Sequence, residues 1–239
     1  MNKIATLRLT GVRGIIAKKM RESLESTAQL SFFCDIDASR LVAARLAWKN
    51  EGIKVGFEDL VIKALAGVLP SFPLFNAIET SDGVEQYPEF HIACAIGLSG
   101  ALVAPAIFNV ENLSVEQIAR AREDLVARAK VNKLSVREMT GGTITISNLG
   151  LTRVRHFTPI LNFPQQAIVA LGQIAPRPWI DSDGETLVVR PVMGLSLTVD
   201  HRIIDGTPAG EFLSALAVKL ETGVAIPATM RLEEKEEIK

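Results

Sequence analysis

Apolar residues recur along the chain with two different periods, and each period predicts a different kind of element. Near the N-terminus, Ile16, Met20 and Leu24 lie on one stripe of a helix. A later helical stretch is followed by Pro70 and Pro73, which cannot continue a helix. The sequence therefore predicts helices over residues 12–24, 39–49 and 58–69, with a strand over residues 30–36 after the first.

Turn and capping residues mark further boundaries. Asp82-Gly83 is a turn signal between two short apolar segments. Ser114 and Gln117 have the spacing of a capping box, which predicts the start of a helix. Thr207 and Pro208 fit the N-cap and first residue of a last helix. That helix carries apolar residues at helical spacing, namely Ala209, Phe212, Leu213, Leu216, Ala217 and Leu220.

Two stretches alternate between apolar and polar residues, as strands with one buried face do. Residues 143–147 alternate so that Ser147 lies on the same face as Thr143 and Thr145. Residues 193–200 alternate in the same way and predict a second half-buried strand, which ends just before His201. Because helices and strands are interleaved, the expected fold class is α/β (α+β) around one large sheet.

One long apolar run resembles a membrane span in length. Residues 92–110 are nineteen residues without a charge. The turn residues Gly97-Leu98-Ser99-Gly100 interrupt this run, and Pro105 lies in its second half. Two buried strands joined by a tight turn explain the run better than a spanning helix. The apolar content of 48% then indicates a buried sheet or a subunit interface rather than a membrane.

Composition argues against several other classes of protein. The chain has 26 Lys and Arg against 27 Asp and Glu, so it lacks the positive charge of a nucleic-acid-binding protein. Cys34 and Cys94 form no paired motif, which argues against a metal site and favours a reducing, cytoplasmic setting. No long apolar segment follows Met1, so we expect no signal peptide.

His201 is the histidine with the most informative position. If the alternation continued by one residue, His201 would share the buried face of Leu197 and Val199. An imidazole of restricted exposure stays neutral and can act as a general base near pH 7. In the alternative interpretation, His201 ends the strand and Asp205-Gly206 makes the turn to the next helix. Spacing alone leaves both interpretations open.

The motif Asp200-His201-Arg202-Ile203-Ile204-Asp205-Gly206 resembles a known active-site signature. It is similar to that of the catalytic domain of the dihydrolipoamide acyltransferases of 2-oxoacid dehydrogenase complexes. Its His-x-x-x-Asp-Gly core is shared with chloramphenicol acetyltransferase. The resemblance implies a chloramphenicol-acetyltransferase-like two-layer sandwich with a large mixed sheet. It continues through residues 9–20, 58–77, 141–150 and 162–168 and covers residues 7–222.

The resemblance also implies a role for each residue of the motif. His201 would remove the proton from the thiol of coenzyme A or dihydrolipoamide, and Ser147 would stabilise the oxyanion of the tetrahedral intermediate. Asp205 would pair with an arginine and hold the active-site loop, and Arg13 is the candidate for that arginine. Alternatively, Asp205 caps the helix that follows it.

Three further residues are candidates for substrate binding. Asn148 would position the substrate, or it serves the turn before Gly150. Arg153 and Arg155 lie beside His156, where they would meet coenzyme A phosphates or an acidic carrier. A solvated loop is the alternative interpretation for these residues.

The family resemblance implies an assembly with shared active sites. In this family the site lies between neighbouring subunits of a homotrimer, with the histidine from one subunit and the serine from the next. Residues 1–230 would form the catalytic domain and residues 231–239 a charged tail, with no lipoyl or subunit-binding domain in the chain. A separate lipoyl-carrier protein or domain would therefore supply the lipoyl group in trans, and the resemblance also implies dehydrogenase components as partners.

The region after the last helix predicts the size of the assembly. Family members that build large cages end in a Leu-rich anchor, and residues 222–230 are not Leu-rich. We therefore expect a trimer that does not form a cage.

The nature of the acyl group and its acceptor is the last expectation. The stretch over residues 147–160 resembles acetyl-transferring members, so acetyl is the first choice, although Arg153 and Arg155 depart from the usual residues. Succinyl and branched-chain acyl groups stay open. The alternatives to a lipoyl thiol are an amine, an alcohol or a carrier-protein thiol as acceptor, or a scaffold subunit without turnover. No metal is expected in the reaction.

Overall fold

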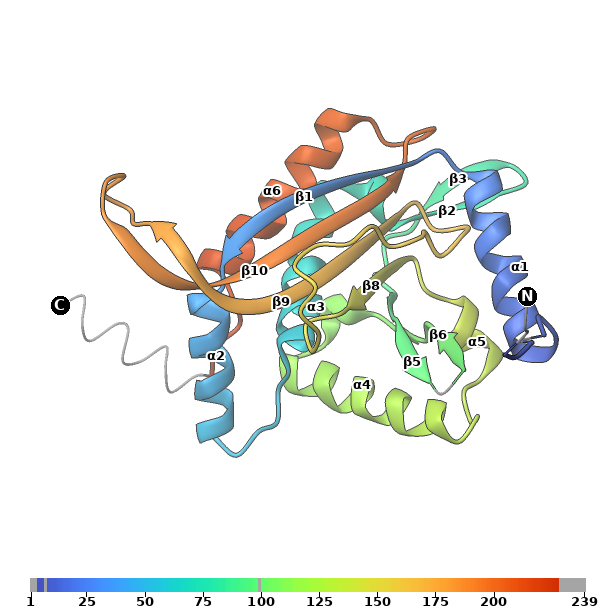
Figure 1. The fold of residues 1–239 in the computed structure, drawn as a ribbon, viewed down its shortest axis with the longest axis horizontal. Helices are drawn as coiled ribbons and strands as arrows, with labels where there is room; N and C mark the ends of the chain where they lie inside the picture. The colour runs from blue at the N-terminus through green and yellow to red at the C-terminus, as the bar shows by residue number, and fades with distance from the viewer. Residues whose placement is uncertain (1–3, 7, 99, 228–239) are drawn as a thin grey trace.

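One six-stranded mixed sheet runs through the centre of the molecule (Figure 1). The computed structural model describes residues 4–6, 8–98 and 100–227. In sheet order the strands are β1 (Gln29–Asp37), β10 (Leu187–Asp200), β9 (Ala167–Ile180), β8 (Ile144–Asn148), β4 (Ile92–Cys94) and β7 (Ala106–Ile107). Strand β8 runs parallel to both β9 and β4, and the other neighbours are antiparallel.

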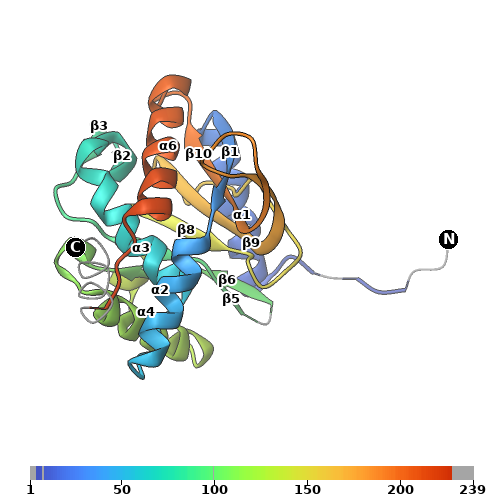
Figure 2. The same cartoon turned by 90° about the vertical axis from the view of Figure 1, so that its left-hand side faces the viewer.

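Helices cover one face of this sheet, and the main core lies between them and the strands (Figure 2). The helices on this face are α2 (Ser39–Asn50), α3 (Phe57–Val68) and α6 (Gly206–Thr222), with α4 (Val115–Lys130) beside α3. The rings of Phe75 and Phe212 stack with centroids 4.1 Å apart. Short helices α5 (Val136–Thr140), η1 (Leu69–Ser71), η2 (Pro73–Asn76) and η3 (Val110–Asn112) connect the larger elements.

Helix α1 (Gly11–Ser26) lies across the sheet from α3, on the face that the side chain of Ser147 shares. The helices predicted over residues 12–24, 39–49 and 58–69 are confirmed as α1, α2 and α3. The capping box is also confirmed, because the Gln117 N–H donates to Ser114 Oγ at 3.2 Å and the Ser114 N–H donates to Gln117 Oε1 at 2.8 Å. Helix α6 begins earlier than predicted, with Asp205 rather than Thr207 at the N-cap.

The apolar run over residues 92–110 forms four short strands rather than two long ones. Strands β4 and β7 pair in the main sheet, whereas β5 (Ile96–Leu98) and β6 (Ala101–Val103) form a separate hairpin. Pro105 has no N–H to donate, so the ladder breaks between β6 and β7. The predicted turn at Asp82-Gly83 joins β2 (Ala77–Thr80) to β3 (Gly83–Gln86). No helix in the described ranges combines the length and the apolar character that a membrane crossing needs.

Residues 192–200 of β10 are buried on both faces, which corrects the prediction of a half-buried strand there. Leu195 and Leu197 face the helices, yet Ser196 and Thr198 on the opposite face are only 1% exposed. The loop over residues 149–166 crosses that second face. Its Arg155 carbonyl occupies the space that a Cβ on Gly172 or Gly194 would need, so only glycine allows this approach.

Candidate active site

Ser147 lies near the end of β8 and opens on a cavity. Ile144 and Ile146 of β8 are fully buried in the core, so strand alternation places Thr145 and Ser147 on the opposite face, as predicted. There Thr145 and Ser147 line a cavity of about 440 Å³ between β8, α1 and the β5–β6 hairpin. No hydrogen bond joins the Ser147 hydroxyl to any described residue, which leaves it available to a ligand.

A chain of hydrogen bonds holds the polar wall beside Ser147. Asn162 Nδ2 donates to Thr145 Oγ1 at 3.2 Å, and Thr145 Oγ1 donates to Gln165 Oε1 at 2.6 Å. Gln165 Nε2 in turn donates to the Gly142 carbonyl at 2.8 Å. Asn162 and Thr145 both face the cavity, and sequence reasoning did not select either. The signal was present for both, because they lie in the family-like stretches over residues 141–150 and 162–168.

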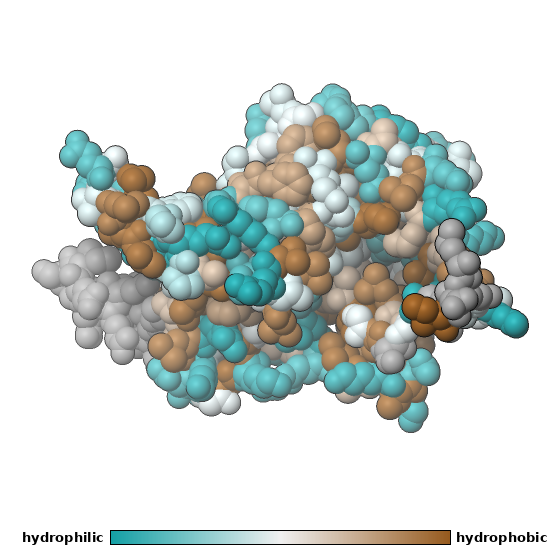
Figure 3. Space-filling model, viewed as in Figure 1, coloured by the Kyte–Doolittle hydropathy of each residue, from teal (hydrophilic) through white to brown (hydrophobic). Residues whose placement is uncertain are grey.

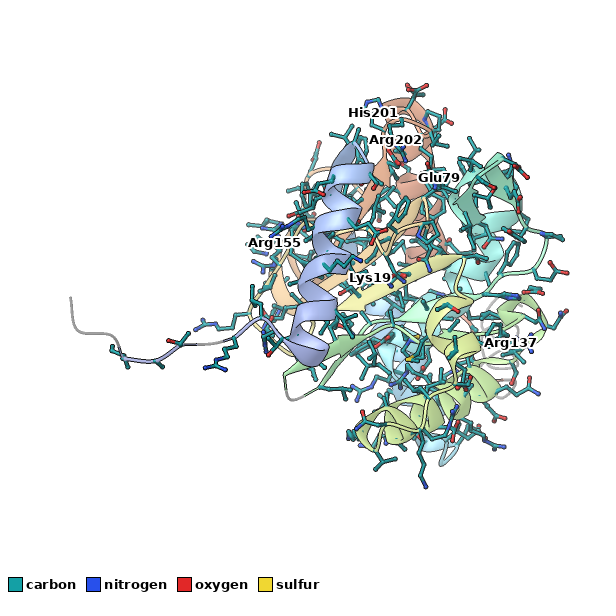
Figure 4. All side chains as sticks on the ribbon, turned by 90° about the vertical axis from the view of Figure 1, so that its right-hand side faces the viewer. Lys19, Glu79, Arg137, Arg155, His201 and Arg202 are labelled. Atoms are coloured by element: carbon teal, nitrogen blue, oxygen red, sulfur yellow. The ribbon has the colours of Figure 1, made fainter. Side chains whose placement is uncertain are left out.

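His201 lies outside this cavity. Strand β10 ends at Asp200, and the chain then turns, with the His201 N–H donating to the Ala28 carbonyl at 2.8 Å. The imidazole is 44% exposed, so in a single chain His201 follows the end of the strand, as in the alternative interpretation, and does not continue the buried face of β10. Figure 4 shows His201 at one end of the molecule, away from Lys19, which lines the Ser147 cavity. One chain therefore does not bring His201 and Ser147 together.

The residues on either side of His201 hold the turn rigidly. Asp200 is fully buried, and its carboxylate accepts hydrogen bonds from Arg202 Nε at 2.8 Å and from the Ala28 N–H at 3.1 Å. Arg202 also pairs with Glu79 of β2 (Figure 4). Burial raises the pKa of Asp200, but its hydrogen bonds from Arg202 and the backbone outweigh burial and hold the pKa below its usual value. Sequence reasoning missed this network, although Asp200 and Arg202 belong to the motif itself.

Asp205 and Arg13 are not partners within one chain. Asp205 Oδ1 lies 3.7 Å from His201 Nδ1, and the Asp205 side chain is 85% exposed and makes no capping hydrogen bond. Arg13 Nη2 instead donates to the Gly100 carbonyl at 3.4 Å. Arg13 is in the first turn of α1, whereas the His201 turn contacts Ala28 beyond the last turn. A helix of this length separates the two ends by about 20 Å. The predicted pair of Arg13 and Asp205 therefore does not form within one chain.

Asn148 faces away from the Ser147 cavity. Its Nδ2 donates to Glu58 Oε2 at 3.2 Å, and its Oδ1 accepts from the Gly150 N–H at 2.8 Å, so it serves the turn as the alternative interpretation proposed. It lines a second cavity of about 350 Å³ together with Glu58 and Arg122. Burial raises the pKa of Glu58 against the opposing effect of the hydrogen bond from Asn148. The side chain of Asn148 therefore lies on the opposite face of β8 from the Ser147 hydroxyl.

Arg155 and His156 anchor the loop that crosses the sheet. Arg155 pairs with Asp35 of β1, and His156 Nε2 lies 3.1 Å from the same carboxylate. Burial raises the pKa of the Asp35 carboxyl. The hydrogen bonds from Arg155 and His156 lower it by more than burial raises it, so the pKa lies below its ordinary value. Arg153 is exposed beside them. Arg155 is therefore engaged in holding the loop, and neither arginine lines the Ser147 cavity.

The fold is that of a known class of acyltransferases. The structure aligns with chloramphenicol acetyltransferase over 84% of this chain and 95% of that chain, at 18% identity and a TM-score of 0.54, and this likeness shows a shared fold. Residues 1–228 match the family described as 2-oxoacid dehydrogenases acyltransferase (catalytic domain). The chain belongs to this family, and the predicted sandwich with a large mixed sheet is confirmed.

A curated relative is the dihydrolipoyllysine-residue acetyltransferase component of the pyruvate dehydrogenase complex of Mycobacterium bovis. It is 37% identical over 228 residues, which are 91% of this chain and 41% of the relative. The chain thus spans about two-fifths of the length of that protein. A probable dihydrolipoamide acetyltransferase from Listeria monocytogenes has a solved structure with 33% identity and a TM-score of 0.86, covering 93% of this chain and 98% of that chain.

Two further solved structures bear on the site and on assembly. Each is 30% identical, covers 92% of both chains and has a TM-score of 0.86. One concerns the roles of a serine, a histidine and an asparagine in the catalytic mechanism of Azotobacter vinelandii dihydrolipoamide acetyltransferase, where the asparagine follows the histidine by four positions. The same spacing separates His201 from Asp205. The other is the cubic core of a pyruvate dehydrogenase multienzyme complex.

Proposed function

We propose that this chain transfers a short acyl group, with acetyl as the first choice, between coenzyme A and a dihydrolipoyl thiol. The observation that carries the proposal is the free Ser147 hydroxyl, which opens on an apolar cavity in a chain that also displays His201 on a braced turn. The names of the relatives support the same reaction. A lipoyl-bearing carrier is the proposed partner, and the cytoplasm is the proposed setting.

The proposed mechanism needs one base and one hydrogen-bond donor. His201 removes the proton from the attacking thiol, and the thiolate adds to the thioester carbonyl. The Ser147 hydroxyl donates to the resulting oxyanion. The intermediate collapses and expels the other thiolate, which recovers the proton from the His201 imidazolium. The Asp205 carboxylate lies 3.7 Å from Nδ1 of this imidazole, at the N-cap of the helix that follows it.

A comparison of thiol, amine and alcohol acceptors tests this function directly. We expect the native chain to acetylate dihydrolipoamide from acetyl-coenzyme A, measured as thioester formation and release of free coenzyme A. Amines and alcohols should react much more slowly than the thiol, because an alcohol is a far weaker acid than a thiol and an alkylamine is largely protonated near pH 7. Acetylation of an amine or alcohol without reaction of dihydrolipoamide contradicts the proposal and favours a detached relative of the family.

A homotrimer completes the proposed site, since Ser147 and His201 lie apart in one chain. Figure 3 shows apolar patches among polar ones on the face in view. The exposed apolar residues of the chain include Leu30, Phe33 and Ile160. A neighbouring chain that covers such residues can bring its His201 to this chain's Ser147. Two substrates can then reach the site from opposite ends of the interface.

We expect light scattering to give the mass of three 25.9 kDa chains. The prediction that the trimer does not build a cage rests on residues 222–230, of which residues 228–230 lie outside the described ranges, as does the charged tail over residues 231–239. A 24-mer or 60-mer in solution contradicts the absence of a cage. A monomer contradicts the shared site as well.

A further inference from the structure

Glu79 lies on β2, outside the motif around His201, yet its side chain reaches the turn that displays this histidine. Arg202 Nη1 and Nη2 donate to Oε1 and Oε2 of Glu79, the first at 3.5 Å. The same guanidinium donates through Nε to Asp200 Oδ2 at 2.8 Å. Figure 4 shows Arg202 close to both His201 and Glu79. Arg202 therefore joins β2 to the residue that precedes His201.

The geometry of this contact distinguishes it from an ordinary surface ion pair. An isolated exposed pair contributes little to stability, because water screens the charges and two long side chains lose rotational freedom. Here one planar guanidinium donates to two carboxylates, and the Asp200 carboxylate is fully buried and also accepts from the Ala28 N–H. Asp200 therefore fixes one side of the guanidinium. Glu79, whose side chain is 29% exposed, holds the outer side.

The backbone of Glu79 is fixed to the segment that supports the wall of the Ser147 cavity. The Glu79 N–H donates to the Pro164 carbonyl at 2.9 Å. The next residue, Gln165, accepts from Thr145 Oγ1 at 2.6 Å, and Thr145 lines the cavity. Strand β2 also pairs with β3 along its whole length. The brace on the turn at the end of β10 therefore starts from a backbone that is itself held in place.

We propose that Glu79 is a positioning residue for acyl transfer, which acts through Arg202 to hold the His201 imidazole in one orientation toward the thiol. This inference rests on the proposed function and adds to it a residue from outside the motif. Proton transfer requires the imidazole nitrogen to lie within hydrogen-bonding distance of the thiol, and a small displacement lowers the rate steeply. Because the imidazole is 44% exposed, its position depends on the backbone of the turn more than on packing.

The first test measures kcat and KM for acetyl transfer to dihydrolipoamide in the native, Glu79→Gln and Glu85→Gln forms of the full chain. Glutamine keeps the size of the side chain but offers the guanidinium one acceptor oxygen in place of two. We expect Glu79→Gln to lower kcat by about tenfold and to leave both KM values unchanged. Glu85 on β3 accepts from Thr80 and Tyr87 instead, so Glu85→Gln is the matched control and should keep the native kcat. A native kcat in Glu79→Gln overturns the inference.

The same substitution in a His201→Ala background separates positioning from a general loss of structure. If Glu79 acts through His201, adding Glu79→Gln should not lower the residual rate of the His201→Ala protein any further. An equal loss of rate in both backgrounds means that the substitution damages the site as a whole, and it overturns the inference.

Amide hydrogen exchange separates this inference from the proposed function. The His201 N–H donates to the Ala28 carbonyl at 2.8 Å, so its exchange rate reports on the turn itself. We expect Glu79→Gln to accelerate this exchange by about fivefold or more, and Glu85→Gln to leave it unchanged. If no form transfers any acyl group but the acceleration is present, the proposed function is wrong and the brace stands. Native exchange at His201 in Glu79→Gln shows that Glu79 does not hold the turn, and the inference is then wrong.

Discussion

Replacing His201 by alanine is expected to lower kcat for acetyl transfer by about 10²- to 10⁴-fold, the usual contribution of a positioned general base. The physical reason is the thiol, which has an ordinary pKa near 8.5 and is only a few per cent ionised at neutral pH. Without His201 the attacking thiolate has to come from this small population. The measurement is kcat with saturating acetyl-coenzyme A and dihydrolipoamide, for native and His201→Ala protein.

The same substitution should leave the fold intact. The imidazole is 44% exposed, and its nearest charged neighbour, Asp205, is itself largely exposed, so little packing is lost. Thermal unfolding of His201→Ala should therefore match that of the native chain. Equal rates for the two proteins would show that His201 is not the base.

Ser147→Ala serves as the second arm of this experiment. Loss of one oxyanion donor typically lowers kcat by about 10²- to 10³-fold. Ser182→Ala, on the exposed hairpin between β9 and β10, is the matched control and should leave kcat unchanged. A Ser147→Ala protein with native kcat would remove the hydroxyl from the mechanism.

Local pattern was sufficient to predict where Ser147 points. Alternation along a strand has a period of two, so the burial of Ile144 and Ile146 determines the face of Thr145 and Ser147 without knowledge of their neighbours. The same reasoning could not decide the position of His201. The pairing of β10 with β1 stops at Gln29 and Asp200, and the buried Asp200 carboxylate then binds the turn that follows. Where a ladder ends depends on tertiary contacts, and alternation carries no information about it.

Contacts between distant segments were the least predictable part of the site. Family likeness suggested that Arg13 holds Asp205, but nothing in sequence spacing states that the two lie at opposite ends of α1. The arginine that braces the turn in one chain is Arg202, which reaches Asp200 and Glu79. An arginine two residues from an aspartate is common on protein surfaces. Only the zero exposure of Asp200 marks this pair as structural.

The separation of His201 from Ser147 leads to a second prediction of large effect, in which two inactive proteins restore each other. His201→Ala retains the native Ser147, and Ser147→Ala retains the native His201. We assume that each site takes its histidine from one subunit and its serine from the next. In random trimers of an equal mixture, two adjacent subunits can then combine in four ways, and one of these four combinations has both the native histidine and the native serine at the shared site. Co-expression or joint refolding should therefore recover about one quarter of native activity.

A second mixture distinguishes sites shared between subunits from sites contained within one chain. When the native chain is mixed equally with the double variant His201→Ala/Ser147→Ala, shared sites predict about one quarter of native activity, because both neighbours must be native. Sites contained within one chain predict about one half for this mixture and no recovery for the first. Single variants mixed without subunit exchange should stay inactive, which controls for activity in the starting proteins. A first mixture that stays inactive after exchange would place the site within one chain, and the exposed turn at His201 would then have to move to reach the cavity at Ser147.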